Sequence, residues 1–121
     1  MSPDRAQSLT LEAFRRGVTS PAPQTLKRYG MTAEEWLDLL AAQGWVCPIC
    51  ERDVADLRLV TDHEHARGWA GMADKDKKTY TRGILCSHCN HRKVHSTLTG
   101  REALRVALYI LAYELRAGRL R

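Results

Sequence analysis

Two pairs of cysteines enclose a short acidic and histidine-rich segment in this chain of 121 residues. Cys47 and Cys50 form one C-x-x-C pair, and 35 residues separate it from the second pair, Cys86 and Cys89. Four sulfurs at this turn spacing suit tetrahedral zinc. Because a shell of four thiolates leaves no position for water, we expect a structural zinc and not a catalytic metal. A redox role is disfavoured because no βαβ pattern surrounds either pair.

The enclosed segment reads D-H-E-H at residues 62–65. A carboxylate is a hard oxygen ligand for Mg²⁺, and a neutral imidazole can take a proton from water at neutral pH. This combination suits hydrolysis of a phosphodiester. Adjacent strand residues point to opposite faces, so Asp62 and His63 can reach one site only if their strand ends or bulges there. A pair of surface histidines, or a second zinc on His63 and His65, is an alternative.

The residue after the last cysteine, Asn90, is the only asparagine of the chain. Its side-chain carbonyl is another hard oxygen ligand, placed at the start of an expected helix. Asp62 and Asn90 could then hold one Mg²⁺ from two elements that the zinc keeps in register. A helix-capping or turn role for Asn90 is the alternative.

The elements that must position these residues are a hairpin and a helix. Residues 57–85 predict two short strands joined by a long polar connection, and residues 87–96 predict a basic helix. Capping-box patterns predict two further helices, one from Thr32 to a stop at Gly44 and one from Thr99 to Gly118. These elements predict a small α+β domain.

The last predicted helix has an apolar face wider than a lone surface helix needs. One stripe and three further apolar residues make up this face: Leu104, Leu108, Leu111 and Leu115, with Val106, Ile110 and Tyr113. The helix either covers the small core or forms a dimer seam, and covering the core is favoured because so short a chain has little else to bury.

Charge is distributed unevenly along the chain. Residues 1–64 hold 7 Lys and Arg against 10 Asp and Glu, a net charge of −3, whereas residues 65–121 hold 12 against 4, a net charge of +8. The basic half is typical of a protein that binds a polyanion such as nucleic acid, although a solvated basic face is the alternative. Without a predicted signal peptide or membrane span, the protein is expected to stay inside a cell.

Taken together, these motifs resemble the phage recombination endonuclease VII family, part of the wider group of HNH or ββα-metal nucleases. The resemblance covers roughly residues 26–95, through LKRYGMTAEEWLDLLAAQGWVCPIC, LVTDHEHARG and TRGILCSHCN. It is specific because the cysteine pairs, the D-H-x-H motif and the asparagine after the final cysteine occur together and in order.

The resemblance implies a fold and roles for the site residues. The fold is a zinc-stapled ββα-metal (HNH-type) domain flanked by helices. The four cysteines hold zinc, Asp62 and Asn90 hold Mg²⁺ or Mn²⁺, and His63 is the general base. His65 is expected near the scissile phosphate. We expect an arm or short helix over residues 1–24, the nuclease core with its preceding helix over 25–98, and the carboxy-terminal helix over 99–121.

Three departures from the family pattern stand out. The connection between the predicted strands is longer than usual, and we expect no counterpart of the long carboxy-terminal part linked to junction resolution, which puts Holliday-junction cleavage in doubt. The middle asparagine of the HNH name has no counterpart, so a backbone carbonyl is the expected partner that orients His63.

These observations predict a metal-dependent DNA endonuclease that nicks or cuts duplex or branched DNA and leaves 5′-phosphate ends, inside the host cytoplasm if phage-encoded. Six basic residues are expected to contact neighbouring phosphates: Lys75, Lys77, Lys78, Arg82, Arg92 and Lys93. A non-catalytic, zinc-stapled nucleic-acid-binding module is the main alternative. A nuclease relative with a regulatory or packaging role is another.

Overall fold

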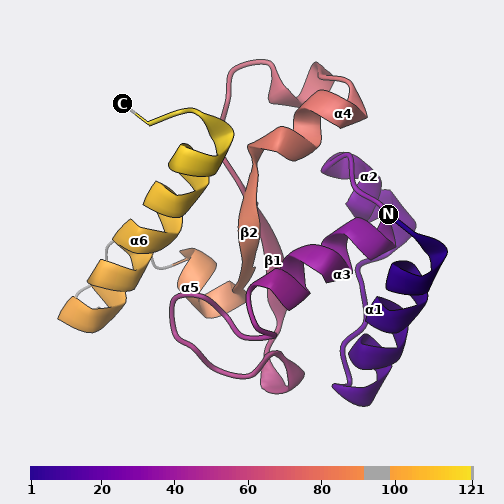
Figure 1. Ribbon diagram of the computed structural model, residues 1–121. Helices are drawn as coiled ribbons and strands as arrows, with labels where there is room; N and C mark the ends of the chain where they lie inside the picture. The colour runs from indigo at the N-terminus through magenta and orange to yellow at the C-terminus, as the bar shows by residue number, and fades with distance from the viewer. Residues whose placement is uncertain (92–98, 121) are drawn as a thin grey trace.

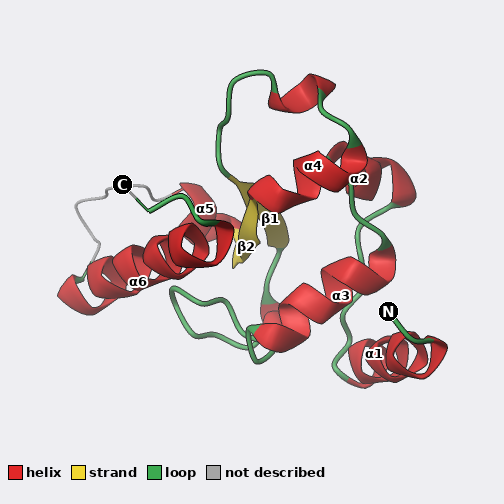
Figure 2. Cartoon of the chain, turned by 45° about the horizontal axis from the view of Figure 1, so that its top comes forward, coloured by secondary structure: helices red, strands yellow, loops and turns green. Residues whose placement is uncertain are grey.

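The computed structural model describes residues 1–91 and 99–120, in which a two-stranded antiparallel sheet lies between two groups of helices (Figure 1). Helices α1, α2 and α3 lie on one side of the sheet and α6 on the other, as Figure 2 also shows. The order is α1 (Pro3–Arg15), α2 (Pro23–Arg28), α3 (Ala33–Ala42), β1 (Leu59–His63), α4 (Asp74–Lys77), β2 (Thr81–Cys86), α5 (Ser87–His91) and α6 (Gly100–Ala117). The predicted α+β class is confirmed.

Helix α3 anchors the sheet. Its predicted capping box is present, with the Thr32 side chain accepting from the Glu35 N–H and the Glu35 carboxylate accepting from the Thr32 N–H. The Trp36 indole donates to Thr61 Oγ1 of β1 at 3.0 Å. At the end of the helix the Gln43 amide exchanges two hydrogen bonds of 2.8 Å with the backbone of Ile84 in β2. Both strands are therefore fastened to α3 by buried or half-buried polar contacts.

The amino-terminal segment contributes to the core. Residues Pro3–Arg15 form helix α1, which Ser2 caps by accepting from the Arg5 N–H. Leu9 and Ala13 are buried in the same apolar cluster as Trp36 of α3. The expected short helix is thus a 13-residue element packed on α3.

The hairpin contains the irregularity that the candidate site requires. Asp62 pairs with Gly83 but His63 pairs with Thr81, so the register shifts between these two residues of β1 and passes over Arg82 of β2. The strand also ends at His63. The long connection, expected as a plain polar loop, instead holds three short helical pieces: η2 (Trp69–Gly71), α4 and η3 (Lys78–Tyr80).

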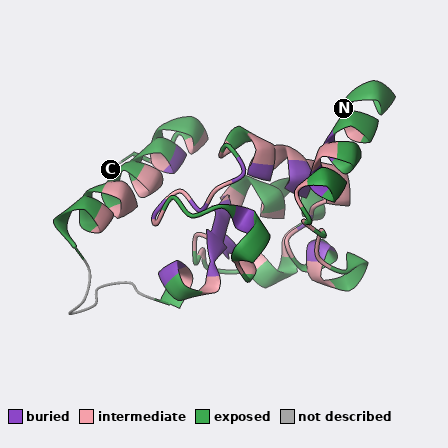
Figure 3. Cartoon of the chain, turned by 90° about the horizontal axis from the view of Figure 1, so that it is seen from below, coloured by how far each residue is buried: buried purple, intermediate pink, exposed green. Residues whose placement is uncertain are grey.

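Helix α6 has two apolar sides with different surroundings. Its predicted capping box of Thr99 and Glu102 is present, and Gly118 ends the helix in the left-handed conformation, with φ of 67°. Val106 and Tyr109 pack on the cysteine cluster, and Tyr113 is buried. The four leucines of the predicted stripe, Leu104, Leu108, Leu111 and Leu115, are 45 to 61 % exposed. Figure 3 accordingly shows α6 mostly exposed, with one buried patch.

Candidate functional site

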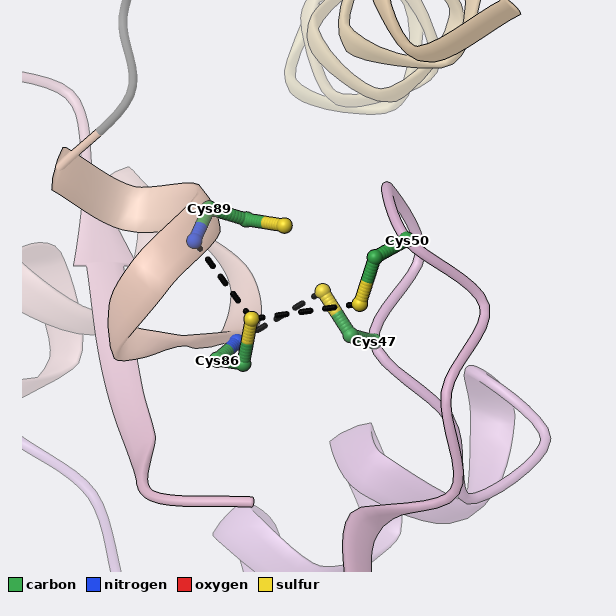
Figure 4. Close-up of side chains that lie close together, drawn as sticks. All are labelled: Cys47, Cys50, Cys86 and Cys89. Atoms are coloured by element: carbon green, nitrogen blue, oxygen red, sulfur yellow. Dashed lines mark hydrogen bonds between the residues drawn. The ribbon is translucent and has the colours of Figure 1, made fainter. Parts of the chain in front are cut away.

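The four cysteines converge in space, as the sequence predicts. Their sulfur atoms all lie within 4.8 Å of one another, and the Sγ atoms of Cys50 and Cys86 are 3.9 Å apart. A tetrahedral zinc with Zn–S bonds of about 2.3 Å would place its sulfurs about 3.8 Å apart. Cys47 and Cys50 come from the turn after α3, whereas Cys86 ends β2 and Cys89 lies in α5 (Figure 4). The cluster could therefore hold a structural zinc.

Backbone N–H groups support the sulfurs. The Cys86 N–H donates to Cys47 Sγ at 3.5 Å, and the Cys89 N–H donates to Cys86 Sγ at 3.4 Å, as drawn in Figure 4. Such donors stabilise negative charge on a thiolate. Glu51, in the left-handed conformation with φ of 63°, closes the first turn by donating its N–H to the Cys47 carbonyl. The cluster thus joins this turn to the end of β2 and the start of α5.

Asp62 is buried and accepts hydrogen bonds from two other elements. Arg82 of β2 donates from Nε to Oδ2 at 2.9 Å and from a terminal nitrogen to Oδ1 at 3.3 Å. Tyr109 of α6 donates its hydroxyl to Oδ2 at 2.9 Å. Gly83 makes this approach possible, because a Cβ there would lie 2.8 Å from the Tyr109 ring. The carboxylate is oriented, and within the described residues Oδ1 accepts a single long hydrogen bond.

Asp62 and Asn90 line the same cavity, which has a volume of about 570 Å³. His65 and Arg82 also line it, and its apolar wall consists of Ile49, Leu85, Cys89, Val106, Tyr109 and Ile110, with His91 at the edge. An aspartate of β1 and an asparagine of α5, whose side chains carry hard oxygen donors, thus line one space. These donors fit a divalent cation such as Mg²⁺.

His63 does not line that cavity but lies against three aromatic rings. Its imidazole stacks on Trp69 with ring centroids 4.0 Å apart, and the rings of His65 and Tyr29 lie 4.8 and 5.7 Å away. Burial and the nearby His65 and Arg82 lower the pKa of His63, although the charge of Asp62 opposes the shift. The imidazole is therefore held in its neutral form at neutral pH.

The basic residues expected to contact DNA have different surroundings. Lys75 is exposed, and the Lys77 ammonium lies 5.3 Å from the Trp69 ring centroid. Lys78 forms an ion pair with Glu35 at 2.8 Å, and Arg82 is paired with Asp62. Arg92 and Lys93 lie outside the described residues.

Three aromatic contacts of the site were not foreseen: Tyr29 and Trp69 against His63, and Tyr109 against Asp62. Trp69 had a sequence signal, because it is the one large aromatic side chain between Gly68 and Gly71 in an otherwise polar connection. Tyr109 had a weaker one, since it shares the i, i+3 and i+4 pattern of Val106, Ile110 and Tyr113. No local pattern marks Tyr29, which reaches His63 only through the fold.

The fold and the site define a small α+β domain in which a four-cysteine cluster joins the turn after α3 to a bulged hairpin and the helix that follows it. The chain belongs to the recombination endonuclease VII family, whose model matches residues 23–112.

Two curated relatives are phage proteins. The chain is 37 % identical over 76 residues to the Gene 59 protein of Mycobacterium phage D29 and 34 % identical over 76 residues to the Gene 59 protein of Mycobacterium phage L5. Each alignment covers 62 % of this chain, and the chain spans about two fifths of the length of these relatives, 39 and 40 %. No solved structure matches significantly.

Proposed function

We propose that this protein is a metal-dependent DNA endonuclease of the HNH type, which hydrolyses phosphodiester bonds. The observation that carries the proposal is the shared cavity of Asp62, His65 and Asn90, next to the four-cysteine cluster, in a chain of an endonuclease family. A simple nucleic-acid-binding module would need no oriented carboxylate in a cavity that an asparagine also lines.

His63 is the general base of this proposal. Its neutral imidazole takes a proton from a water molecule in line with the P–O3′ bond, and cleavage leaves a 5′-phosphate and a 3′-hydroxyl. The lowered pKa of His63 keeps the base unprotonated at neutral pH. His65, exposed beside it and facing the cavity, supports the scissile phosphate.

Asp62 and Asn90 would hold the divalent ion, Mg²⁺ or Mn²⁺. The available Oδ1 of Asp62 and the amide oxygen of Asn90 supply the hard ligands. The chemistry supplied by the bound ion would be stabilisation of the charge on the phosphorane and on the leaving 3′-oxygen. Arg82 and Tyr109 keep the carboxylate turned towards the cavity.

DNA binds along the basic half of the chain. Lys75 and Lys77 contact phosphates from the connection between the strands, together with Arg92 and Lys93 after α5. Lys78 and Arg82 join these contacts only if they leave Glu35 and Asp62. The Arg82 pair is the less exposed of the two, so Arg82 is the costlier residue to release.

The protein acts as a homodimer through α6. The exposed leucines at positions 104, 108, 111 and 115 follow the four-three-four spacing of a coiled-coil seam, and Ala103, Ala107 and Ala112 extend this exposed apolar face. In a two-fold dimer the same surface of both subunits meets, so this face would pack against its copy on the second subunit. None of the described helices is long and apolar enough to cross a membrane.

The proposal is tested with supercoiled plasmid, Mg²⁺ or Mn²⁺, and zinc-loaded protein. The wild type should relax the plasmid or make it linear, and His63→Ala should lower the rate about 10²- to 10⁴-fold. Asn90→Ala should lose cleavage, with recovery at raised Mn²⁺ concentration. Equal zinc content and DNA affinity in all three proteins exclude misfolding as the cause. If the wild type binds DNA but does not cut it with either metal, the protein is a binding module.

A further inference from the structure

One face of the His63 imidazole is covered by the Trp69 indole. The two ring planes are 18° from parallel and their centroids are 4.0 Å apart. Trp69 opens the short helix η2, directly after Gly68, whose φ of 76° is in the left-handed region that favours glycine. This turn brings the long connection back over the end of β1.

The indole is itself held in place from two sides. Its Nε1 donates to the Lys77 carbonyl at 3.3 Å, and the Lys77 ammonium lies 5.3 Å from the ring centroid. Tyr29, at the end of α2, packs 5.7 Å away. The connection is also fixed next to Tyr29, since a Cβ on Gly30 would overlap the backbone of Asp74. Trp69 is therefore a restrained surface on which another ring can be oriented.

A stack restrains the imidazole without using its nitrogens. The contact involves the face of the ring, whereas the N–H bond and the lone pair of a neutral imidazole lie in the ring plane. Within residues 1–91 and 99–120, no hydrogen bond to the His63 ring is formed, so the expected backbone carbonyl is not found there. The nitrogen that must accept a proton stays available.

We propose that Trp69 is the positioning residue of His63, in place of a hydrogen-bond partner, which the described part of the chain does not provide. The inference rests on the proposed function, in which His63 is the general base. A base is effective only when its nitrogen is aimed at the attacking water, so loss of the stack should impair the chemical step more than DNA binding.

The first readout does not depend on cleavage. In zinc-loaded protein at pH 8, the carbon-bound ring protons of His63 should resonate upfield in the wild type because they lie against the indole face. These signals, assigned by comparison with His63→Gln, should move downfield in Trp69→Leu and stay largely upfield in Trp69→Phe. Ala70→Ser, an exposed change in the same turn, is the matched control and should leave them in place.

The second readout is plasmid cleavage. Trp69→Leu should lower kcat about 10- to 100-fold with KM nearly unchanged, and Trp69→Phe should recover most of the loss. Unchanged His63 signals in Trp69→Leu overturn the inference, whether or not the wild type cuts DNA. Full kcat in that variant, beside an active wild type, overturns it as well. An inactive wild type refutes the nuclease proposal instead, and the His63 signals still decide whether the indole orients the imidazole.

Discussion

The Asp62 carboxylate receives hydrogen bonds from side chains that are 20 and 47 positions away in the sequence. The Arg82 pair is largely buried, where a charged group without a partner is costly. Tyr109 adds a neutral donor to the oxygen that also accepts from Arg82 Nε. Burial and the charge of Asp62 raise the pKa of the Tyr109 hydroxyl, so it remains a donor at any working pH.

A double-mutant cycle measures this contact. Tyr109→Phe removes only the hydroxyl, and Asp62→Asn weakens the acceptor by removing its charge. If the hydrogen bond forms, the two changes in the free energy of unfolding should be non-additive by about 1 kcal/mol in urea titrations of zinc-loaded protein. Additivity within about 0.3 kcal/mol would count against the contact. Tyr80→Phe crossed with Asp62→Asn is the control, because none of the interactions found for Tyr80 involves Asp62.

At the scale of elements, α6 ties together parts of the chain that no local signal connects. Near its start, Arg101 and Arg105 pair with Glu51 of the first cysteine turn, and Arg105 also donates to the Pro48 carbonyl. Beyond its end, Arg119 lies over the Tyr80 ring at 3.8 Å and donates to the Thr79 carbonyl. The helix thus braces the cysteine turn, Asp62 and the end of the connection at once.

At the other end of the hairpin, the cysteine cluster joins the turn after α3 to β2 and α5. Removal of zinc tests whether this cluster stabilises the fold. Structural zinc contributes binding free energy on the order of 10 kcal/mol in small domains. Cys50→Ser, or treatment with a strong chelator, should therefore lower the melting temperature sharply. Hydrogen exchange should accelerate first at β2 and α5, whereas α1 and α3, held by their own apolar cluster, should stay protected longer.

Added zinc should reverse the effect of the chelator but not that of the substitution. Ser87→Ala, next to Cys86 and outside the sulfur cluster, is the matched control and should keep the wild-type melting temperature within a few degrees. A chelator-treated protein that loses its zinc and melts at the same temperature would show that the cluster is not a structural site.

At the scale of the whole molecule, one side of α6 is an apolar surface that stays exposed to solvent in the single chain. Four leucines about half exposed on one helix form an apolar patch of the kind that marks an interaction site. Two copies joined there would carry two cavities, one on each protomer, which suits cleavage of both strands of a duplex or branched substrate.

Charge substitution on this face tests the dimer. Light scattering after size exclusion should give the wild type a mass near twice 13.7 kDa. Leu108→Glu with Leu111→Glu should give the single-chain mass and convert linear plasmid products into nicked circles. Leu11→Glu, at a similarly exposed leucine of α1, should remain dimeric. A wild type that is monomeric at high concentration would disprove the seam.

The local sequence alone determined the capped helices α3 and α6, the two strands and the cysteine cluster, but not α2 or the short helical pieces of the connection. The features that it determined depend on residues a few positions apart, so they can be recognised without the tertiary structure. They are the capping boxes at Thr32 and Thr99, the glycine stop at Gly118 and the C-x-x-C turns. The strand period also predicted that β1 must end or bulge at Asp62 and His63 if the two are to share a site, and the strand does both there.

Only the tertiary structure decided what surrounds the candidate catalytic residues. Tyr29 reaches His63, and Tyr109 reaches Asp62, from distant parts of the sequence, and Trp69 covers the His63 ring only because the connection turns back at Gly68. Both apolar stripes of α6 fit the helical period, so the sequence does not decide which one faces the core. The stripe with Tyr109 and Tyr113 packs inwards, where the Tyr109 hydroxyl donates to Asp62 and the Tyr113 hydroxyl accepts from Arg119. The four leucines stay exposed, although their burial would be favourable, so this apolar surface is available for a partner.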